Sequence, residues 1–173
     1  RRQRQMCIRD SYYRGKEGGE SENQFVDRIV SNLENLIISE NPETIAAFIA
    51  EPITGASGVI VPPEGYYEKV QSVLSKYNIM FWADEVLTGF GRTGSDFGCT
   101  TMNIHDPDMM TFAKQLSSAY MPISASAIRR DVYEAMIDQS AAAGAFGHGY
   151  TYSGHPVACA VALRVRAIYE RAT

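Results

Sequence analysis

The sequence predicts an α/β protein with a mostly parallel sheet flanked by helices, and three observations support this class. Amphipathic helical patterns alternate with short, nearly unbroken apolar runs, which is typical of parallel strands buried on both faces. Hydrophobic residues make up 45% of the 173 residues, enough to build a core. In addition, each of three apolar runs ends in a charged residue, as expected where neighbouring strands reach a ligand-binding edge.

The alternation is clearest before residue 115. Apolar side chains at helical spacing predict a helix from Glu22 to the Asn41-Pro42 pair. One further helix and three strands follow in this part: the helix GYYEKVQSVLSKYN (65–78) and the strands TIAAFIAEP (44–52), IMFWADE (79–85) and DMMTFAK (108–114).

After residue 114 the predicted elements are a small strand, a helix, a loop and a last helix. PISASAI (122–128) is strand-like, and RRDVYEAMID (129–138) has helical spacing. A loop rich in Gly and Ala runs to Gly149, and the last helix begins near His155-Pro156 with proline in its first turn. The final RVRAIYERAT stops inside a helical pattern, so we expect an internal fragment of a longer, enzyme-sized protein.

Glu51, Asp84 and Lys114 end the three apolar runs. If these runs are neighbouring parallel strands, their charges emerge at the same carboxyl edge, where open α/β sheets bind ligands. The simpler interpretation is that charges mark strand ends facing water. Two acids and one amine that could converge favour a functional site.

The segment GFGRTG (89–94) matches the Gly-x-Gly-x-x-Gly pattern of dinucleotide-binding proteins. In that motif the first glycine lies at the turn from strand to helix, and the helix N-terminus binds the pyrophosphate. Here residues 84–88 intervene, and the polar segment 95–108 has no helical period. We therefore expect these glycines to shape a long loop, and keep a nucleotide-binding domain as the weaker alternative.

Asp84 and Glu85 could form a metal or acid/base pair, but adjacent strand residues point to opposite faces, so one of them is expected to face a site. A buried carboxylate there needs a cationic or hydrogen-bonding partner. Lys114 lies between the uncharged segments MMTFA and QLSSAYMPIS. It is either a partly buried amine with a lowered pKa, suited to nucleophilic chemistry, or a solvated lysine at the start of a loop.

Other polar residues give weaker signals. Thr151 and Ser153 form a hydroxyl-rich turn ahead of a helix, which is plausible phosphate-binding chemistry in a common kind of loop. No metal site is expected, because the remaining cysteines and the histidines lack ligand spacing: Cys99, Cys159, His148 and His155.

Residues 1–11, RRQRQMCIRDS, reverse-translate naturally to a sequencing-library adapter, and we expect them to be a read-through artefact. The alternative is a basic arm for nucleic acid or anionic surfaces. The formal net charge of −4 becomes more negative without this arginine-rich segment, which argues against nucleic acid. No apolar run is long enough for a membrane helix and no secretory signal is evident, so a cytoplasmic setting is expected.

Four ordered blocks resemble the class III, or omega-type, aminotransferases that use pyridoxal phosphate: AAFIAEPITGASGVIVPPEGYY, ADEVLTGFGRTG, TFAKQLSSAYMPISA and HGYTYSGHPVACAVAL. The resemblance spans about residues 45–165. It implies the fold type I architecture, with one antiparallel strand after the lysine loop, and a homodimer or a tetramer of dimers. Residues 12–173 would then form part of the cofactor-binding large domain, with the N-terminal segment and the C-terminal small domain missing.

The resemblance also assigns roles to five residues. Lys114 matches the lysine that forms a Schiff base with the cofactor and moves the proton between substrate and cofactor. Asp84 matches the aspartate that pairs with the pyridine nitrogen, and Val86 the aliphatic residue packed against the ring. Glu51 matches the glutamate of the EP motif near the cofactor. Thr151 matches the threonine that reaches the cofactor phosphate of the neighbouring subunit.

The lysine loop departs from the commoner family pattern, because Gln115 and Ala119 stand where glycines are more usual. KQLSSAYMPIS is most similar to the branch of amine and β-alanine:pyruvate transaminases. This resemblance implies transfer of an amino group from an amine or ω-amino acid to a keto acid, with pyruvate expected. A decarboxylating transaminase and an aminomutase remain alternatives on the same scaffold.

Overall fold

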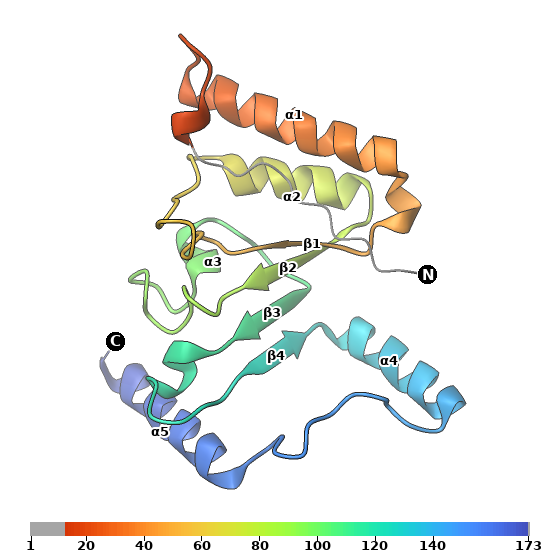
Figure 1. Cartoon of the computed structure of the whole chain (residues 1–173), viewed down its shortest axis with the longest axis vertical. Helices are drawn as coiled ribbons and strands as arrows, with labels where there is room; N and C mark the ends of the chain where they lie inside the picture. The colour runs from red at the N-terminus through yellow and green to blue at the C-terminus, as the bar shows by residue number, and fades with distance from the viewer. Residues whose placement is uncertain (1–12, 173) are drawn as a thin grey trace.

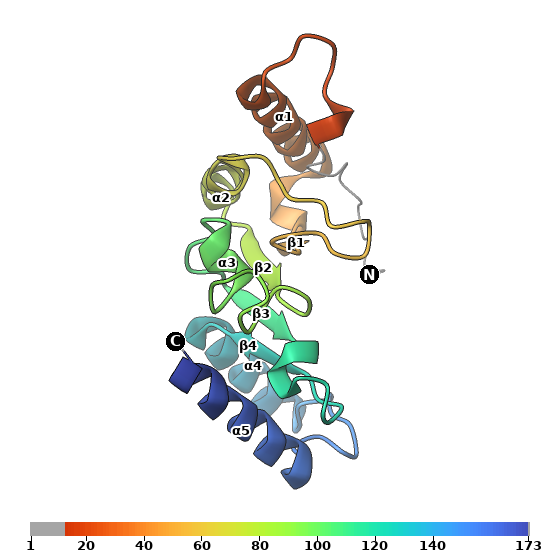
Figure 2. The same cartoon turned by 90° about the vertical axis from the view of Figure 1, so that its left-hand side faces the viewer.

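The computed structural model describes residues 13–172, so the expected adapter segment 1–11 lies outside the described residues. One four-stranded sheet lies between a pair of helices, α1 and α2, and a second pair, α4 and α5 (Figures 1 and 2). The strands are β1 (Ala47–Ala50), β2 (Met80–Asp84), β3 (Met109–Phe112) and β4 (Ala125–Ile128). The α-helices are α1 (Glu22–Glu40), α2 (Tyr66–Lys76), α3 (Gly98–Thr101), α4 (Arg130–Ala143) and α5 (Pro156–Ala172). Three short 3₁₀ helices are η1 (Tyr13–Gly15), η2 (Pro42–Thr44) and η3 (Lys114–Ser117).

Helix α1 begins at a capping box and ends where the sequence predicts. The Ser21 hydroxyl accepts the N–H of Gln24 at 3.3 Å, and the Gln24 side chain accepts the N–H of Ser21 at 2.9 Å. After Glu40 the chain leaves the helix at Asn41, whose φ of 68° is left-handed, and Pro42 cannot continue it. Local sequence therefore determines both ends of this helix.

The core lies between α1, α2 and one face of the sheet. Helices α1 and α2 supply apolar side chains at helical spacing, and β2 supplies alternate residues. The buried members of this core are Val26, Val30, Leu33, Ile37, Tyr66, Tyr67, Val70, Val73, Leu74, Ile79, Phe81, Ala83, Cys99 and Ile104. All of them come from residues 26–104, so the early part of the chain builds the cluster without help from α4 or α5.

The sheet has the order β1-β2-β3-β4. Strands β1, β2 and β3 pair in parallel, and β4 pairs antiparallel with β3. This confirms the predicted α/β class with a mostly parallel sheet and one antiparallel strand after the lysine loop. None of the helices described between residues 13 and 172 is long and apolar enough to cross a membrane.

The side chains of strand β2 alternate between the two faces of the sheet. Phe81 and Ala83 are buried in the core against the helices, whereas Met80, Trp82 and Asp84 are half-buried. Because side chains alternate along a strand, Asp84 shares the face opposite the α1–α2 core. The site residue predicted at the end of this strand therefore faces away from the core.

Two elements differ from the sequence expectation. Helix α4 continues past the predicted boundary at residue 138 to Ala143, through an Ala-rich segment of high helix propensity, and Gly144 ends it with a φ of 85°. A single helical turn, α3, forms inside segment 95–108, where no helix was expected. Its first amides donate to a buried carboxylate, a long-range contact that no local pattern reveals.

Candidate active site

The carboxyl ends of the three parallel strands meet at one edge, as the sequence predicts. Glu51 directly follows β1, Asp84 is the last residue of β2, and Lys114 begins η3 just after β3. The register pairs Ala50 with Ala83 and Asp84 with Thr111, so the three strands end at the same level. Figure 2 shows the loops that follow β1, β2 and β3 side by side at this edge.

Asp84 presents a carboxylate with one oxygen engaged. Its Oδ1 accepts the backbone N–H of Val86 at 3.0 Å, a turn that begins where the strand ends. On the same face, the Trp82 indole donates to the Thr111 hydroxyl at 2.7 Å and connects β2 to β3. Within residues 13–172 no donor or cation pairs with Oδ2, so that oxygen is available to a ligand.

Val86 lies in the turn after β2 and is half-buried. Strand alternation alone does not place it, because the strand has already ended. The hydrogen bond from its N–H to Asp84 instead keeps the two residues together. Their proximity is therefore a property of the turn.

Glu85 points to the opposite face, which confirms that the two adjacent acids do not share a ligand. Its side chain is 1% exposed and accepts three hydrogen bonds. The donors are the Thr88 hydroxyl at 2.6 Å and the backbone N–H groups of Gly98 and Cys99 at 3.0 and 2.7 Å. The pKa of the Cys99 thiol lies well above its ordinary value. Burial is the main cause, and the nearby Glu85 carboxylate adds to it.

Lys114 is exposed and begins η3 with a φ of 41°. A left-handed conformation is costly for a residue with a Cβ, and such strain is concentrated at functional positions. The backbone carbonyl of Lys114 accepts the N–H of Ala119 at 3.3 Å, which closes the loop. In this chain the structure supports the solvated interpretation of the lysine over the buried one.

Glu51 is fixed by hydrogen bonds at both its side chain and its backbone. Its Oε2 accepts the N–H of Gly55 at 2.9 Å, and its carbonyl accepts the Tyr67 hydroxyl at 2.6 Å. Burial raises the pKa of Tyr67, so this phenol stays a donor. A Cβ at Gly55 would lie 1.7 Å from Leu87 Cδ2, so a larger residue there would displace the Leu87 side chain.

Thr151 lies apart from these residues in the part of the chain that the structure describes. It occupies an exposed turn before α5, where the N–H of Ser153 donates to the Tyr150 carbonyl at 3.0 Å. Figure 1 shows the segment between α4 and α5 on the far side of β4 from β1. No hydrogen bond described for residues 13–172 joins Thr151 to Asp84 or Lys114.

The GFGRTG segment forms a loop, as predicted. Gly91 and Gly94 have φ values of 89° and 90°, and the Phe90 ring packs against Phe97 and Phe112 with centroids 5.6 and 5.5 Å apart. The first helix after β2 is the single turn α3, whose leading amides are already bonded to a carboxylate. This geometry contradicts the dinucleotide-binding alternative, because no free helix N-terminus follows the strand directly.

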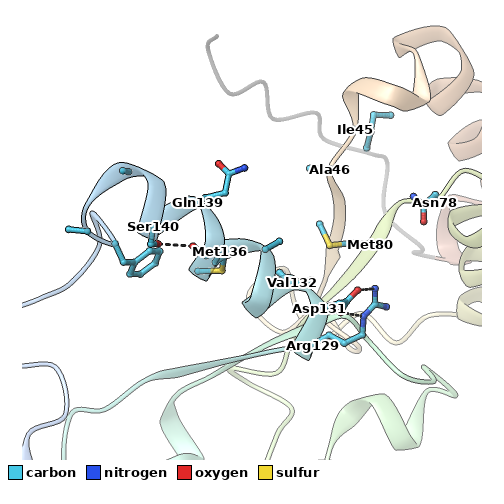
Figure 3. A pocket seen from close by; sticks show the side chains of 14 residues that line it. Ile45, Ala46, Asn78, Met80, Arg129, Asp131, Val132, Met136, Gln139 and Ser140 are labelled. Carbon is cyan, nitrogen blue, oxygen red and sulfur yellow. Dashed lines mark hydrogen bonds and ion pairs between the residues drawn. The ribbon is translucent and has the colours of Figure 1, made fainter.

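An open groove lies at the other end of the strands. Figure 3 shows it between α4 and the starts of β1 and β2. Its volume is about 870 Å³. Arg129, Met80 and Met136 are among its lining residues, and Arg129 forms an ion pair with Asp131 at 2.6 Å. The groove is therefore separate from the edge that carries Asp84. Among the described residues, no three His, Cys, Asp or Glu side chains are grouped so as to hold a metal ion.

A parallel sheet with two carboxylates and an amine at its carboxyl edge defines the class of protein: an α/β protein with a ligand site at that edge. The chain belongs to the class III aminotransferase family, whose family model (Aminotransferase class-III) matches residues 8–173. Class III aminotransferases depend on pyridoxal phosphate. The predicted family and cofactor are thus confirmed.

Several relatives are plant enzymes. The chain is 55% identical over 159 residues to gamma aminobutyrate transaminase 3, chloroplastic, of Solanum lycopersicum, covering 92% of this chain and 30% of that protein. It is 54% identical to probable gamma-aminobutyrate transaminase 2, mitochondrial, of Oryza sativa subsp. indica, covering 92% and 32%. The chain therefore spans about a third of the length of these relatives.

Solved structures agree with the fold. A transaminase with L-alanine has a TM-score of 0.90 and 54% identity over 92% of this chain and 37% of that one. The omega transaminase from Pseudomonas jessenii in complex with PMP has a TM-score of 0.89 and 57% identity over 92% and 35%. The predicted fold type I architecture is confirmed.

The expected cytoplasmic setting is wrong by this comparison. The plant relatives are named as chloroplastic or mitochondrial proteins. The expectation rested on the lack of an apolar span and of a secretory signal. Neither property distinguishes the cytoplasm from the interior of an organelle.

The sequence did not identify the hydrogen-bond donors of Glu85. Its alternation with Asp84 indicated the buried face, but its donors Gly98 and Cys99 come from a loop that closes 13 and 14 residues later. A signal was present in the pattern: a Glu in a buried strand position requires donors nearby.

Proposed function

We propose that the polypeptide containing this chain is a transaminase that moves an amino group from an amine or ω-amino acid to a keto acid, with pyruvate as the favoured acceptor. The observation that carries the proposal is the free Oδ2 of Asp84 at the edge shared with Lys114, in a chain of this family. Relatives named for gamma-aminobutyrate support an ω-amino acid as donor. Residues 12–173 would form part of the large domain.

The residues at the edge fit pyridoxal phosphate by their chemistry. A carboxylate with an unpaired oxygen suits a protonated pyridine nitrogen, and an exposed primary amine suits an aldehyde carbon. When bound, the cofactor supplies an electron sink for the carbon that loses its proton. Asp84 would hold the ring nitrogen and favour its protonated form.

Lys114 would attach the cofactor through its Nζ and then carry a proton on that nitrogen between substrate and cofactor carbons. Its exposed side chain at the start of the loop supports this role, because an exposed amine is accessible to cofactor and substrate. Glu51 would organise the side of the ring that carries its oxygen, and Val86 would pack against the ring.

Thr151 is assigned to the neighbouring subunit's cofactor phosphate, which makes the protein a homodimer with sites completed in trans. The support is its exposed turn ahead of α5 and its separation from Asp84 and Lys114 within one chain. A hydroxyl and backbone amides before a helix suit a phosphate group.

The assay uses the full-length polypeptide with an amine donor and pyruvate. Transamination yields alanine without carbon dioxide; gas release would indicate the decarboxylating alternative, and an isomerised donor the aminomutase. Absence of any alanine would refute the proposal.

Lys114→Ala tests the lysine directly. We expect the full-length variant to lose the visible absorbance of bound cofactor on dialysis and to react about 10²- to 10⁴-fold more slowly, because it lacks the proton carrier. Lys76→Ala, at the exposed end of α2, is the matched control and should keep both. Unchanged colour in Lys114→Ala would contradict the role of this lysine.

A further inference from the structure

Glu85 is the most completely bonded polar side chain at the carboxyl edge, and the proposed function does not use it. It is 1% exposed, and three donors reach its carboxylate at 2.6, 2.7 and 3.0 Å. A buried carboxylate costs several kcal/mol unless it is satisfied in this way, on the order of the penalty for any buried ion. The three donors offset this penalty, so losing any one of them would leave a buried carboxylate less well satisfied.

The backbone of Glu85 is fixed as well. Its N–H donates to the Thr111 carbonyl of β3 at 3.0 Å, which extends the ladder one residue past β2. Its carbonyl accepts the N–H of Gly89 at 3.0 Å. Glu85 thus connects the strand end, the turn that follows it and the start of α3.

The return of the loop to Glu85 depends on close packing at Gly98. A Cβ on Gly98 would lie 2.6 Å from the Thr88 Cβ and 3.0 Å from the Pro52 Cβ. Only glycine lets the amides of Gly98 and Cys99 reach the carboxylate. Both ends of the loop 86–97 are therefore held at one side chain.

Asp84 and Val86 flank Glu85, and their own hydrogen bond is the first contact of the same loop. The contacts of Glu85 therefore adjoin the turn that holds the Asp84 carboxylate. We infer that Glu85 is a positioning residue, whose bonds to Thr88, Gly98 and Cys99 orient Asp84 toward the cofactor's ring nitrogen. This inference rests on the proposed function of Asp84.

The experiment uses the full-length polypeptide and a pair of variants at one donor. Thr88→Val removes the hydroxyl but keeps the branched shape, and Thr88→Ser keeps the hydroxyl. Glu85→Gln replaces an acceptor oxygen by an N–H₂ that faces the backbone donors. Leu33→Ala in α1 is a control for loss of stability alone, because Leu33 packs in the helical core.

We expect Glu85→Gln to weaken pyridoxal phosphate binding about 10-fold and Thr88→Val to weaken it less, as for other groups that orient a ligand-binding residue. Both should shift the pH at which the bound cofactor's absorbance changes, and lower kcat with little change in KM for the amine. In the cofactor-free protein, hydrogen exchange should accelerate across residues 84–99. Thr88→Ser should match the wild type, and Leu33→Ala should lower Tm without moving the spectrum.

The outcomes separate the two proposals. If the wild type binds cofactor and both variants lower Tm without changing its spectrum, affinity or exchange in residues 84–99, Glu85 is only a structural residue and the inference is wrong. If Glu85→Gln fails to fold, the Thr88 pair decides by the same criteria. If the wild type itself binds no pyridoxal phosphate, the proposed function fails and the positioning role fails with it. This holds even if hydrogen exchange in residues 84–99 is faster in the variants.

Discussion

Residues 21–112 and residues 113–172 differ in how they bury their apolar side chains. The first part contains the helices α1 and α2 and every member of the core cluster. In the second part α4 has no buried residue, and α5 buries Ala158 and Val165 while Leu163 and Ile168 stay exposed. The comparison shows that the chain holds one nearly complete core and one open layer.

The proposed site spans both parts. Glu51 and Asp84 lie on the packed part, where hydrogen bonds to the backbone fix their carboxylates. Lys114 lies at the boundary, and Thr151 lies in the open layer. The contacts of α5 with η3 connect the two, and the Ser118 and Tyr169 hydroxyls are 2.6 Å apart. The two carboxylates are thus held by hydrogen bonds to the backbone, whereas Lys114 and Thr151 are exposed.

The largest expected difference between the two parts comes from one chemical change made in each. Leu33 is 3% exposed and Leu163 is 67% exposed. In the 173-residue chain, Leu33→Ala should lower the free energy of unfolding by about 2–5 kcal/mol, because it leaves a cavity. Leu163→Ala should change it by less than about 0.5 kcal/mol. Urea denaturation measures both.

Equal losses in the two variants would contradict the comparison. Measuring the same two variants in the full-length polypeptide tests the comparison further. If other parts of that polypeptide cover α5, Leu163→Ala there should cost about as much as Leu33→Ala.

The next effect concerns catalysis on the packed part. Asp84→Asn keeps an oxygen for the N–H of Val86 but removes the charge, so the turn survives while the anionic partner proposed for the ring nitrogen is lost. We expect kcat of the full-length enzyme to fall about 10²- to 10³-fold. Steady-state kinetics measure this. Asp96→Asn, in the exposed loop, is the control, and equal rates for the two variants would refute the role of Asp84.

The sequence was sufficient to predict most of the packed part. Periodicity places α1, α2 and the three parallel strands, and the end of each strand identifies Glu51, Asp84 and Lys114. These features depend on local pattern and on the rule that parallel strands share a carboxyl edge. The shared edge follows even though no pair among the three residues is close in sequence.

Other features depend on contacts that no local pattern encodes. The bond from Cys99 to Glu85 requires the path of the intervening loop, and α3 forms where that bond is made. Exposure of Lys114 depends on what surrounds the loop, which a run of uncharged neighbours does not determine. The length of α4 was underestimated because alanine favours a helix without adding an apolar stripe.

A smaller effect tests the anchoring of Glu51. Tyr67→Phe removes the donor to the Glu51 carbonyl and should lower the free energy of unfolding by about 1–3 kcal/mol, because a shielded acceptor loses its partner. Tyr77→Phe removes a hydroxyl that donates to Glu34 at 3.0 Å, where Lys76 remains as a partner. This control should cost less than about 0.5 kcal/mol. A larger loss in Tyr77→Phe, measured by urea denaturation, would reverse the ranking.

The smallest effect lies at the boundary between the two parts and concerns Ala119, a departure from the family pattern. Ala119 has a φ of 61°, in the left-handed region where alanine is disfavoured by about 1–2 kcal/mol and glycine is not. Ala119→Gly should therefore raise the free energy of unfolding by about 0.5–1 kcal/mol, after the added flexibility of the unfolded chain is counted. The matched change Ala141→Gly, inside α4, should lower it by about 1 kcal/mol. Thermal unfolding of the full-length polypeptide should show a higher Tm for Ala119→Gly and a lower Tm for Ala141→Gly. A lower Tm for Ala119→Gly would mean that the lysine loop gains more from the alanine side chain than it loses in backbone strain.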